Sequence, residues 1–185
     1  VTETGGSTSV AETGTTDTFT VVLDAQPSTD VVFSISSSDT GEATVISTLT
    51  FANGNWDTPQ TVTVTGVDDN IIDGNISSTL TISVIDAISD NDFDAVADQT
   101  VTATTTDDDV AGFTVTETGG STSISESGTT DTFTVVLNAQ PDSDVVFAIT
   151  SSNIGEATVT STLTFTNGNW DTPQTVTVTG VDDDI

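Results

Sequence analysis

The sequence contains no lysine, arginine, histidine or cysteine, and each absence excludes a class of function. Without cysteine the chain has no disulfide and no thiolate metal site. Without histidine it lacks the usual general base and the usual zinc ligand. Without lysine or arginine it has no cation to contact the phosphates of a nucleic acid. It also has no basic side chain that could neutralise a carboxylate.

Long apolar runs are also missing, so no segment of the sequence is suited to insertion into a membrane. The sequence begins without methionine and without a recognisable signal peptide. We therefore expect these residues to be a piece of a longer protein.

Acidic residues are abundant, and the 29 Asp and Glu give the chain a formal net charge of −29. Such acidity often accompanies disorder, but disordered chains are poor in β-branched and aromatic residues. Here Val, Ile and Thr are frequent, and 8 Phe and 2 Trp are present, which is typical of β-strands. A folded chain of this charge repels itself. Its carboxylates must therefore be spread over salt-screened loops or bind mobile cations.

The sequence repeats itself with a period of 114 residues. Residues 1–9 return unchanged as residues 115–123, and the two copies are identical at 58 of 71 aligned positions. A period of this length suits one whole domain per repeat. We expect a first β-sandwich repeat over residues 1–109, with its first strand partly missing, and a second over residues 110–185.

The second copy stops before the counterparts of residues 72–109. We expect it to lack its C-terminal strands and to present an open sheet edge. Another chain could fill this edge by strand addition; the alternative is that the sequence simply stops there.

Period-two alternation of apolar and polar residues predicts strands throughout each copy. In the first copy the predicted strands are residues 10–12, 18–23, 31–36, 43–45, 48–51, 60–65, 79–86 and 99–106. Turn-forming residues separate them, and no segment has helical periodicity with caps. The pattern predicts an all-β fold, an antiparallel β-sandwich of immunoglobulin-like type, with a barrel as the alternative. Trp56 and Trp170 are expected to plug the two cores.

The carboxylates cluster in a few loops. The clusters are Asp68, Asp69 and Asp73 after the strand predicted at 60–65, Asp107, Asp108 and Asp109 after the last strand, and Asp182, Asp183 and Asp184 in the second copy. Adjacent carboxylates repel unless a cation lies between them. Oxygen ligands without nitrogen or sulfur favour Ca²⁺ in flexible loops, whereas Mg²⁺ would keep more waters. The alternative is a solvated acidic surface, and a further loop with Asp90, Asp92, Asp94 and Asp98 fits either interpretation equally.

Three segments have the pattern of a known family. The run Asp107-Asp108-Asp109-Val110-Ala111-Gly112-Phe113-Thr114 resembles the junction between tandem domains of the Calx-β family, which occurs in sodium/calcium exchangers and in large bacterial surface proteins. The run Val10-Ala11-Glu12-Thr13-Gly14 resembles the first-strand glutamate motif, and Val67-Asp68-Asp69-Asn70-Ile71-Ile72-Asp73 resembles the acidic loop between late strands. The resemblance implies a β-sandwich that holds Ca²⁺ at one end through loops and the interdomain linker.

The resemblance also implies a ligand set. In the first copy it comprises Glu12, Asp39, Asp68, Asp69, Asp73, Asp107, Asp108 and Asp109, and in the second copy Glu126, Asp182, Asp183 and Asp184. Asn153 stands in place of Asp39 in the second copy, which removes one charge. Gly74-Asn75-Ile76 replaces the glutamate-rich continuation of the exchangers, so we expect looser binding, with the roughly millimolar affinity of extracellular modules.

Near-identical copies without cysteine but with acidic loops predict a structural role. We expect a repeat of a secreted or cell-surface adhesin or filament, stiffened by calcium, whose partners are neighbouring repeats and, in a filament, identical chains. The alternative is a calcium-sensing regulatory module, against which the near-identity of the copies argues. An enzyme is not expected: glycoside hydrolysis needs only two carboxylates, but the aromatic residues of a sugar-binding cleft are scarce.

Overall fold

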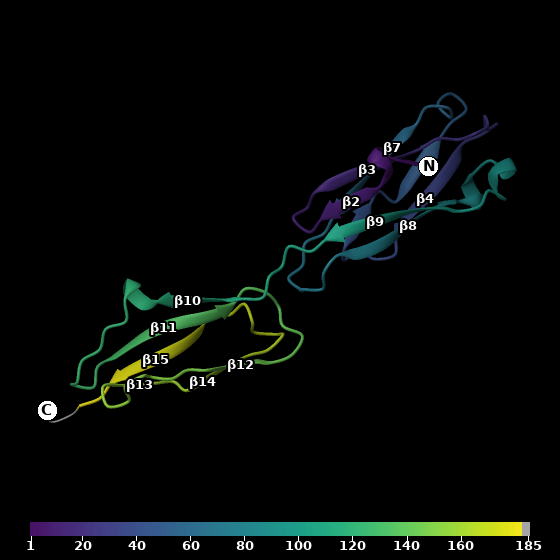
Figure 1. Ribbon diagram of the computed structural model, residues 1–185. Helices are drawn as coiled ribbons and strands as arrows, with labels where there is room; N and C mark the ends of the chain where they lie inside the picture. Colours follow the sequence, from purple (N-terminus) through teal and green to yellow (C-terminus); the bar gives the residue numbers. More distant parts are fainter. Residues whose placement is uncertain (183–185) are drawn as a thin grey trace. The chain divides into compact units, whose positions relative to one another are not determined.

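The computed structural model describes residues 1–182 and shows strands throughout (Figure 1). The chain divides into two units. The first comprises Val1–Asp69 and Asp73–Asp108, and the second comprises Asn70–Ile72 and the chain from Asp109 on. Among the described residues, no helix has the length and apolar character needed to cross a membrane.

The first unit consists of two sheets that enclose one core. One sheet has the order β1 (Thr2–Glu3), β3 (Thr16–Val21), β7 (Gln60–Gly66) and β5 (Ala43–Val45). The other has the order β2 (Thr8–Ala11), β9 (Gln99–Thr106), β8 (Ile76–Val84), β4 (Val31–Ser37) and β6 (Thr48–Phe51). Neighbouring strands are antiparallel except β2 and β9, which are parallel. Three short 3-10 turns, η1 (Thr4–Gly6), η2 (Asp86–Ile88) and η3 (Asn91–Phe93), lie in the connections.

Alternation in the sequence decides which side chains enter this core. In β7, Val62 and Val64 are fully buried and face Phe19 and other apolar residues of the core, while Thr61 and Thr63 are exposed. Threonine pairs with threonine across β3 and β7 on the outer face, where β-branched side chains suit a pleated surface. The predicted all-β antiparallel sandwich is therefore confirmed, and Trp56 packs half-buried against the core.

Several predicted strand boundaries were wrong. The strand expected over residues 79–86 is Ile76–Val84: Ile76 already pairs with Thr105, and η2 begins at Asp86. The strand β1 was not predicted, because a two-residue strand has no detectable alternation.

The second unit repeats one sheet and part of the other. Its larger sheet has the order β10 (Phe113–Glu117), β11 (Thr130–Leu137), β15 (Gln174–Gly180) and β13 (Ala157–Val159), and its smaller sheet pairs β12 (Val145–Ala148) with β14 (Thr162–Phe165). The turn η4 (Thr118–Gly120) is the counterpart of η1. No described residues of this unit form an equivalent of β2, β8 or β9.

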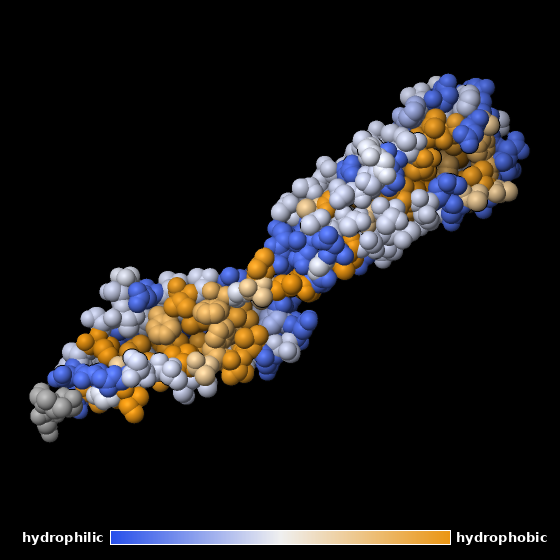
Figure 2. Space-filling view, viewed as in Figure 1, coloured by the Kyte–Doolittle hydropathy of each residue, from blue (hydrophilic) through white to orange (hydrophobic). Residues whose placement is uncertain are grey.

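This difference leaves the second core thinner. In the first unit Val31, Phe33 and Ile35 of β4 are at most 6% exposed. Their counterparts Val145, Phe147 and Ile149 are half-buried. Figure 2 shows hydrophobic residues on the visible surface of this unit. Residues 122–125, the counterparts of β2, form no strand, because β2 pairs only with β9.

Candidate metal centre

Four acidic residues lie at one end of the first unit. At this end β2 and β9 run in parallel and end side by side (Figure 1). Glu12 follows β2, Glu42 precedes β5, Asp73 lies between β7 and β8, and Asp107 follows β9. Carboxylate oxygens of Glu12, Glu42 and Asp73 lie within 4.8 Å of one another, and an oxygen of Asp107 lies within the same distance of one of Glu12.

Hydrogen bonds hold three of the converging loops together. The backbone carbonyl of Glu42 accepts hydrogen bonds from the Val67 N–H at 2.9 Å and from the Thr105 hydroxyl at 3.2 Å. The Asp107 carboxylate accepts one from the Gly74 N–H at 2.7 Å. The loop before β5, the acidic loop after β7 and the segment after β9 are thereby linked to one another.

A close backbone approach positions Glu12. The end of β2 lies directly on β7, and a Cβ atom at Gly66 would collide with the Ala11 carbonyl. The Glu12 N–H donates to the Thr106 carbonyl at 3.1 Å, and the Gly66 N–H donates to the Thr15 carbonyl at 3.0 Å. Glycine is needed at position 66 because any side chain would push β2 away from the sheet.

Glu12 is 1% exposed. Burial raises the pKa of Glu12 to about 7; the Asp108 N–H, which donates to Glu12 Oε2 at 3.4 Å, lowers this pKa, and the charges of Asp107, Asp69 and Glu42 raise it further. A buried group favours its neutral form when no cation is at hand, and this chain has no basic side chain.

Glu42 is 5% exposed. Burial raises the pKa of Glu42, and the charges of Asp73, Asp69 and Asp39 add to this effect. Within residues 1–182, no group donates a hydrogen bond to its buried Oε2 atom. Leaving a buried polar atom unsatisfied costs about 1–3 kcal/mol, so the arrangement needs a further partner.

The geometry suits a divalent cation with oxygen ligands. Ca²⁺ accepts 6–8 oxygens at about 2.3–2.6 Å, so ligands on opposite sides of one ion lie about 5 Å apart. The mutual limit of 4.8 Å among the Glu12, Glu42 and Asp73 oxygens is compatible with one shared ion. The chain offers neither His nor Cys as a competing ligand, which disfavours zinc.

The other predicted ligands of the first copy differ in exposure. Asp69 is half-buried, and its charge raises the pKa values of both Glu12 and Glu42. Asp68 and Asp108 are exposed. Asp109 is half-buried and belongs to the second unit.

Asp39 has a local structural contact. Its Oδ1 atom accepts a hydrogen bond from the Gly41 N–H at 3.0 Å, and its charge raises the pKa of Glu42. Asn153 accepts the equivalent bond from Gly155 at 3.1 Å. This loop therefore needs an acceptor at the position, which either Asp or Asn supplies.

In the second copy the predicted carboxylates are exposed. Glu126 and Asp182 are both exposed, while Asp183 and Asp184 lie outside the described residues. Glu126 and Glu156, the counterparts of Glu12 and Glu42, line one open cavity of about 530 Å³. The first copy buries the equivalent pair because β9 lies beside β2.

Sequence reasoning missed Glu42. The residue has no acidic neighbour in the sequence and directly precedes a short apolar strand, so the clustering of carboxylates does not indicate it. One feature of the sequence could have indicated it: both copies have a glutamate, Glu42 and Glu156, directly before a strand that otherwise contains only apolar residues and threonine.

The acidic loop around Asp90 is built differently. Asp90 is 5% exposed, and its carboxylate accepts hydrogen bonds from the Asp92 N–H, the Thr29 N–H, and the Ser28 hydroxyl and N–H at 2.6–3.1 Å. These bonds lower the pKa of Asp90 to about 2. Asp90 therefore caps η3 and ties it to the loop before β4.

We expect Asp90→Ala to lower the melting temperature of the first unit by several degrees at pH 7, because four donor contacts lose their acceptor. The ionised carboxylate contributes stability above its unfolded pKa of 3.8, and this contribution is lost as the pH falls toward about 2. Thermal melts from pH 7 to pH 2 measure the effect. Asp92→Ala, which removes an exposed carboxylate, is the control; equal melting of both variants would contradict the role of Asp90.

Comparison with protein-family models and with curated proteins gives no match. Among solved structures, the chain is similar to the calcium binding domain CBD12 of CALX1.1 (TM-score 0.38, 16% identity, covering 97% of this chain and 74% of that one). It is also similar to SSP-19, an MSP-domain protein of Caenorhabditis elegans (0.37, 20%, 57% and 97%). A third similar structure is surface layer protein SbsC, domains 4–9 (0.35, 18%, 96% and 26%).

Proposed function

We propose that this chain is a structural tandem-repeat module of a secreted or cell-surface protein, an adhesin or filament, and that it binds Ca²⁺ through Glu12, Glu42, Asp73 and Asp107. The observation that carries the proposal is the Glu42 carboxylate. It is buried beside two further carboxylates, its Oε2 atom has no partner within residues 1–182, and the chain contains no basic side chain.

Calcium would stabilise the folded state because the unfolded chain does not bring these oxygens together. Binding to the folded state alone contributes RT ln(1 + [L]/Kd), about 1.4 kcal/mol at ten times Kd. Extracellular calcium modules bind with Kd values of roughly 0.1–1 mM. A site of this affinity is filled outside a cell, which is where we place the protein.

Calcium would also restrain the start of the linker. Asp107 directly follows β9 and accepts a hydrogen bond from Gly74. An ion bound to Asp107 would therefore fix the chain at the point where it leaves the first unit. Neighbouring repeats, and identical chains in a filament, are the partners that such a stiffened module would serve.

Calorimetric titration of the EDTA-treated 185-residue chain with CaCl₂ tests the proposal. We expect a Kd of roughly 0.1–1 mM, and Glu42→Gln should weaken binding at least tenfold because it removes a buried charge. Glu156→Gln is the matched control, since it makes the same change at the exposed counterpart.

Two results would count against this function. Binding that is equally unaffected by Glu42→Gln and Glu156→Gln would place calcium elsewhere. Sites of sub-micromolar affinity would favour a calcium-sensing regulatory module over a structural one.

A further inference from the structure

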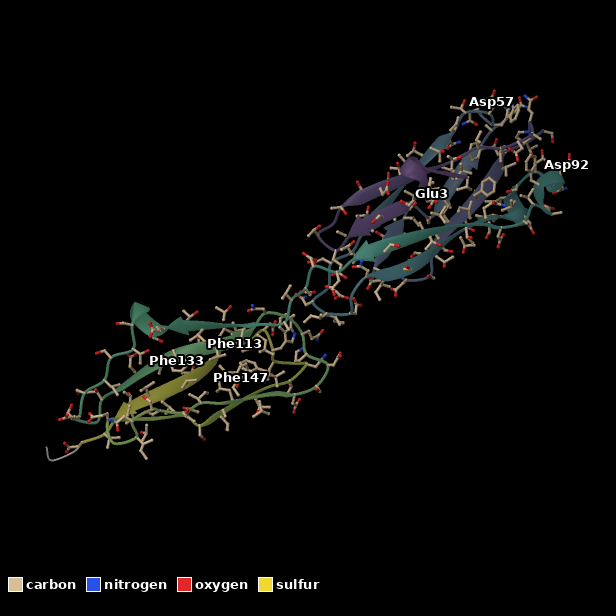
Figure 3. All side chains as sticks on the ribbon, viewed as in Figure 1. Glu3, Asp57, Asp92, Phe113, Phe133 and Phe147 are labelled. Atoms are coloured by element: carbon tan, nitrogen blue, oxygen red, sulfur yellow. The ribbon has the colours of Figure 1, made fainter. Side chains whose placement is uncertain are left out.

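The turn between β6 and β7 contains an asparagine followed by a glycine, Asn53-Gly54, and both residues are exposed. The Asn55 N–H donates to the Ala52 carbonyl at 3.1 Å, so Asn53 and Gly54 are the two central residues of the turn. The turn lies at the end of the first unit where Asp57 is labelled in Figure 3. Water therefore reaches the asparagine side chain and the peptide bond that follows it.

The fold does not require glycine at position 54. Its φ angle is not positive, and a Cβ atom at this position would meet no atom within 4 Å. At the equivalent Gly168 the nearest atom, Thr166 Oγ1, would lie 4.0 Å from such a Cβ. The missing side chain therefore matters for chemistry rather than for packing, because it leaves the nitrogen that follows the asparagine unhindered.

Two features favour attack of the Gly54 nitrogen on the Asn53 side chain. Among residues 1–182, no acceptor binds the Gly54 N–H, so this nitrogen can release its proton to solvent. Gln26 Nε2 donates to Asn53 Oδ1 at 3.3 Å and to the Asn53 main-chain carbonyl at 3.2 Å. A donor at Oδ1 stabilises the negative charge that develops on this oxygen during the attack.

One contact opposes the reaction. Asn53 Nδ2 donates to the carbonyl of Pro27 at 2.9 Å, which restrains the side-chain amide. A neutral hydrogen bond of this kind changes a rate by roughly 2–10-fold. The bond therefore slows the attack and does not prevent it.

We propose that the Asn53-Gly54 turn is a site of spontaneous covalent modification, at which Asn53 is converted to aspartate and isoaspartate. The Gly54 nitrogen loses its proton to solvent and attacks Cγ of Asn53. The new C–N bond closes a succinimide ring, the Cγ–Nδ2 bond breaks, and Nδ2 takes up a proton and leaves as ammonia. Water then opens the ring: cleavage at the side-chain carbonyl gives aspartate, and cleavage at the main-chain carbonyl gives isoaspartate.

The second copy carries a hydroxyl group that protects the equivalent Asn167. Thr166 stands in place of Ala52, and the Gly168 N–H donates to Thr166 Oγ1 at 3.3 Å. The nitrogen must give up this hydrogen bond before it can attack. Thr166→Ala should therefore speed the conversion of Asn167 by roughly 2–10-fold, and Ala52→Thr should slow that of Asn53 by the same factor.

Conversion changes the turn itself. Aspartate adds one more negative charge to a chain that has no basic side chain. Isoaspartate inserts a methylene group into the main chain, which moves the Asn55 N–H away from the Ala52 carbonyl. The bond from the Leu23 N–H to the Trp56 carbonyl, 3.2 Å long, follows directly. Chains that carry isoaspartate should therefore melt at a lower temperature than unmodified chains.

Incubation of the folded 185-residue chain at pH 8, followed by proteolysis and mass spectrometry, tests the inference. Cleavage before aspartate yields residues 39–56 and 144–170 as two different peptides. We expect Asn53 to gain the mass of an amide-to-acid exchange with time and to give two products that chromatography separates. Asn55, which precedes the bulky Trp56, should stay unchanged in the same peptide and is the internal control.

Gly54→Ala is the matched variant, since the structure has room for the added methyl group, and a thermal melt shows that it is folded. It should slow the conversion of Asn53 by roughly tenfold or more, because a Cβ atom hinders the attacking nitrogen. The inference is overturned if Asn53 is converted no faster than Asn55, or if Gly54→Ala leaves the rate unchanged. An unchanged rate in both Ala52→Thr and Thr166→Ala would contradict the protection by the hydroxyl.

Discussion

The calcium-free protein should lose stability as the pH rises from about 4.5 to about 7. In the folded first unit the pKa of Glu12 is raised from 4.5 to about 7, chiefly by burial. Between these values the folded state holds a proton that the unfolded state has released, so the free energy of unfolding falls as the pH rises. The difference corresponds to about 3 kcal/mol, or a fall of roughly 10–20 °C in melting temperature for a unit of this size. The raised pKa of Glu42 acts in the same direction.

Calcium should reverse this dependence, because carboxylate ligands must be deprotonated to bind a metal. Thermal melts at pH 4.5 and pH 8, in EDTA and in millimolar CaCl₂, measure both effects. We expect calcium to stabilise the protein at pH 8 and to have little effect at pH 4.5.

Glu12→Gln separates the effect of the buried charge on stability from the effect of calcium. At pH 8 in EDTA it should raise the melting temperature, since it removes a buried charge, and it should abolish the response to calcium. Glu126→Gln, at the exposed counterpart, should leave both unchanged. A flat pH profile in EDTA, or a normal calcium response of Glu12→Gln, would show that the buried carboxylate does not control stability.

The fold class could be predicted from the sequence because the alternation of apolar and polar residues matches the burial of their side chains in the structure. In β7 each valine that the pattern assigns to the core is fully buried. The parallel pairing of β2 with β9 was not readable, since it joins segments more than 90 residues apart. The start of β8 was also misjudged, because pairing with β9 decides it.

The candidate site was predicted in part for a similar reason. The sequence identified Glu12, Asp73 and Asp107, but Glu42 joins them only through folding. Conversely, adjacent carboxylates do not by themselves make a site: the chain uses Asp90 as an acceptor for backbone donors. The sequence shows where carboxylates are close together along the chain. Only the structure shows which of them are buried and therefore need a cation or a hydrogen-bond donor.

The two units should also differ in stability, with the second opening first. Among residues 1–182, the core cluster of the first unit contains 16 buried apolar residues and that of the second contains 5. Full burial of a side chain of this kind contributes about 1.5–3 kcal/mol to the free energy of unfolding. Because Val145, Phe147 and Ile149 are only half-buried, the second unit lacks about 3 kcal/mol of the stabilisation that their counterparts give the first unit. Since tenfold corresponds to 1.4 kcal/mol, amides of β15 should exchange roughly 100-fold faster than those of β7.

The strands Gln60–Gly66 and Gln174–Gly180 have the same sequence, QTVTVTG, so their intrinsic exchange rates are nearly equal. Any difference measured by native-state hydrogen exchange must then arise from tertiary burial and not from local propensity. Calcium should widen the difference, because the buried carboxylate group lies in the first unit. Equal protection of the two strands in EDTA would mean that β8 and β9 add little to the stability of the sandwich, contrary to the burial of β4 beside β8 in the same sheet.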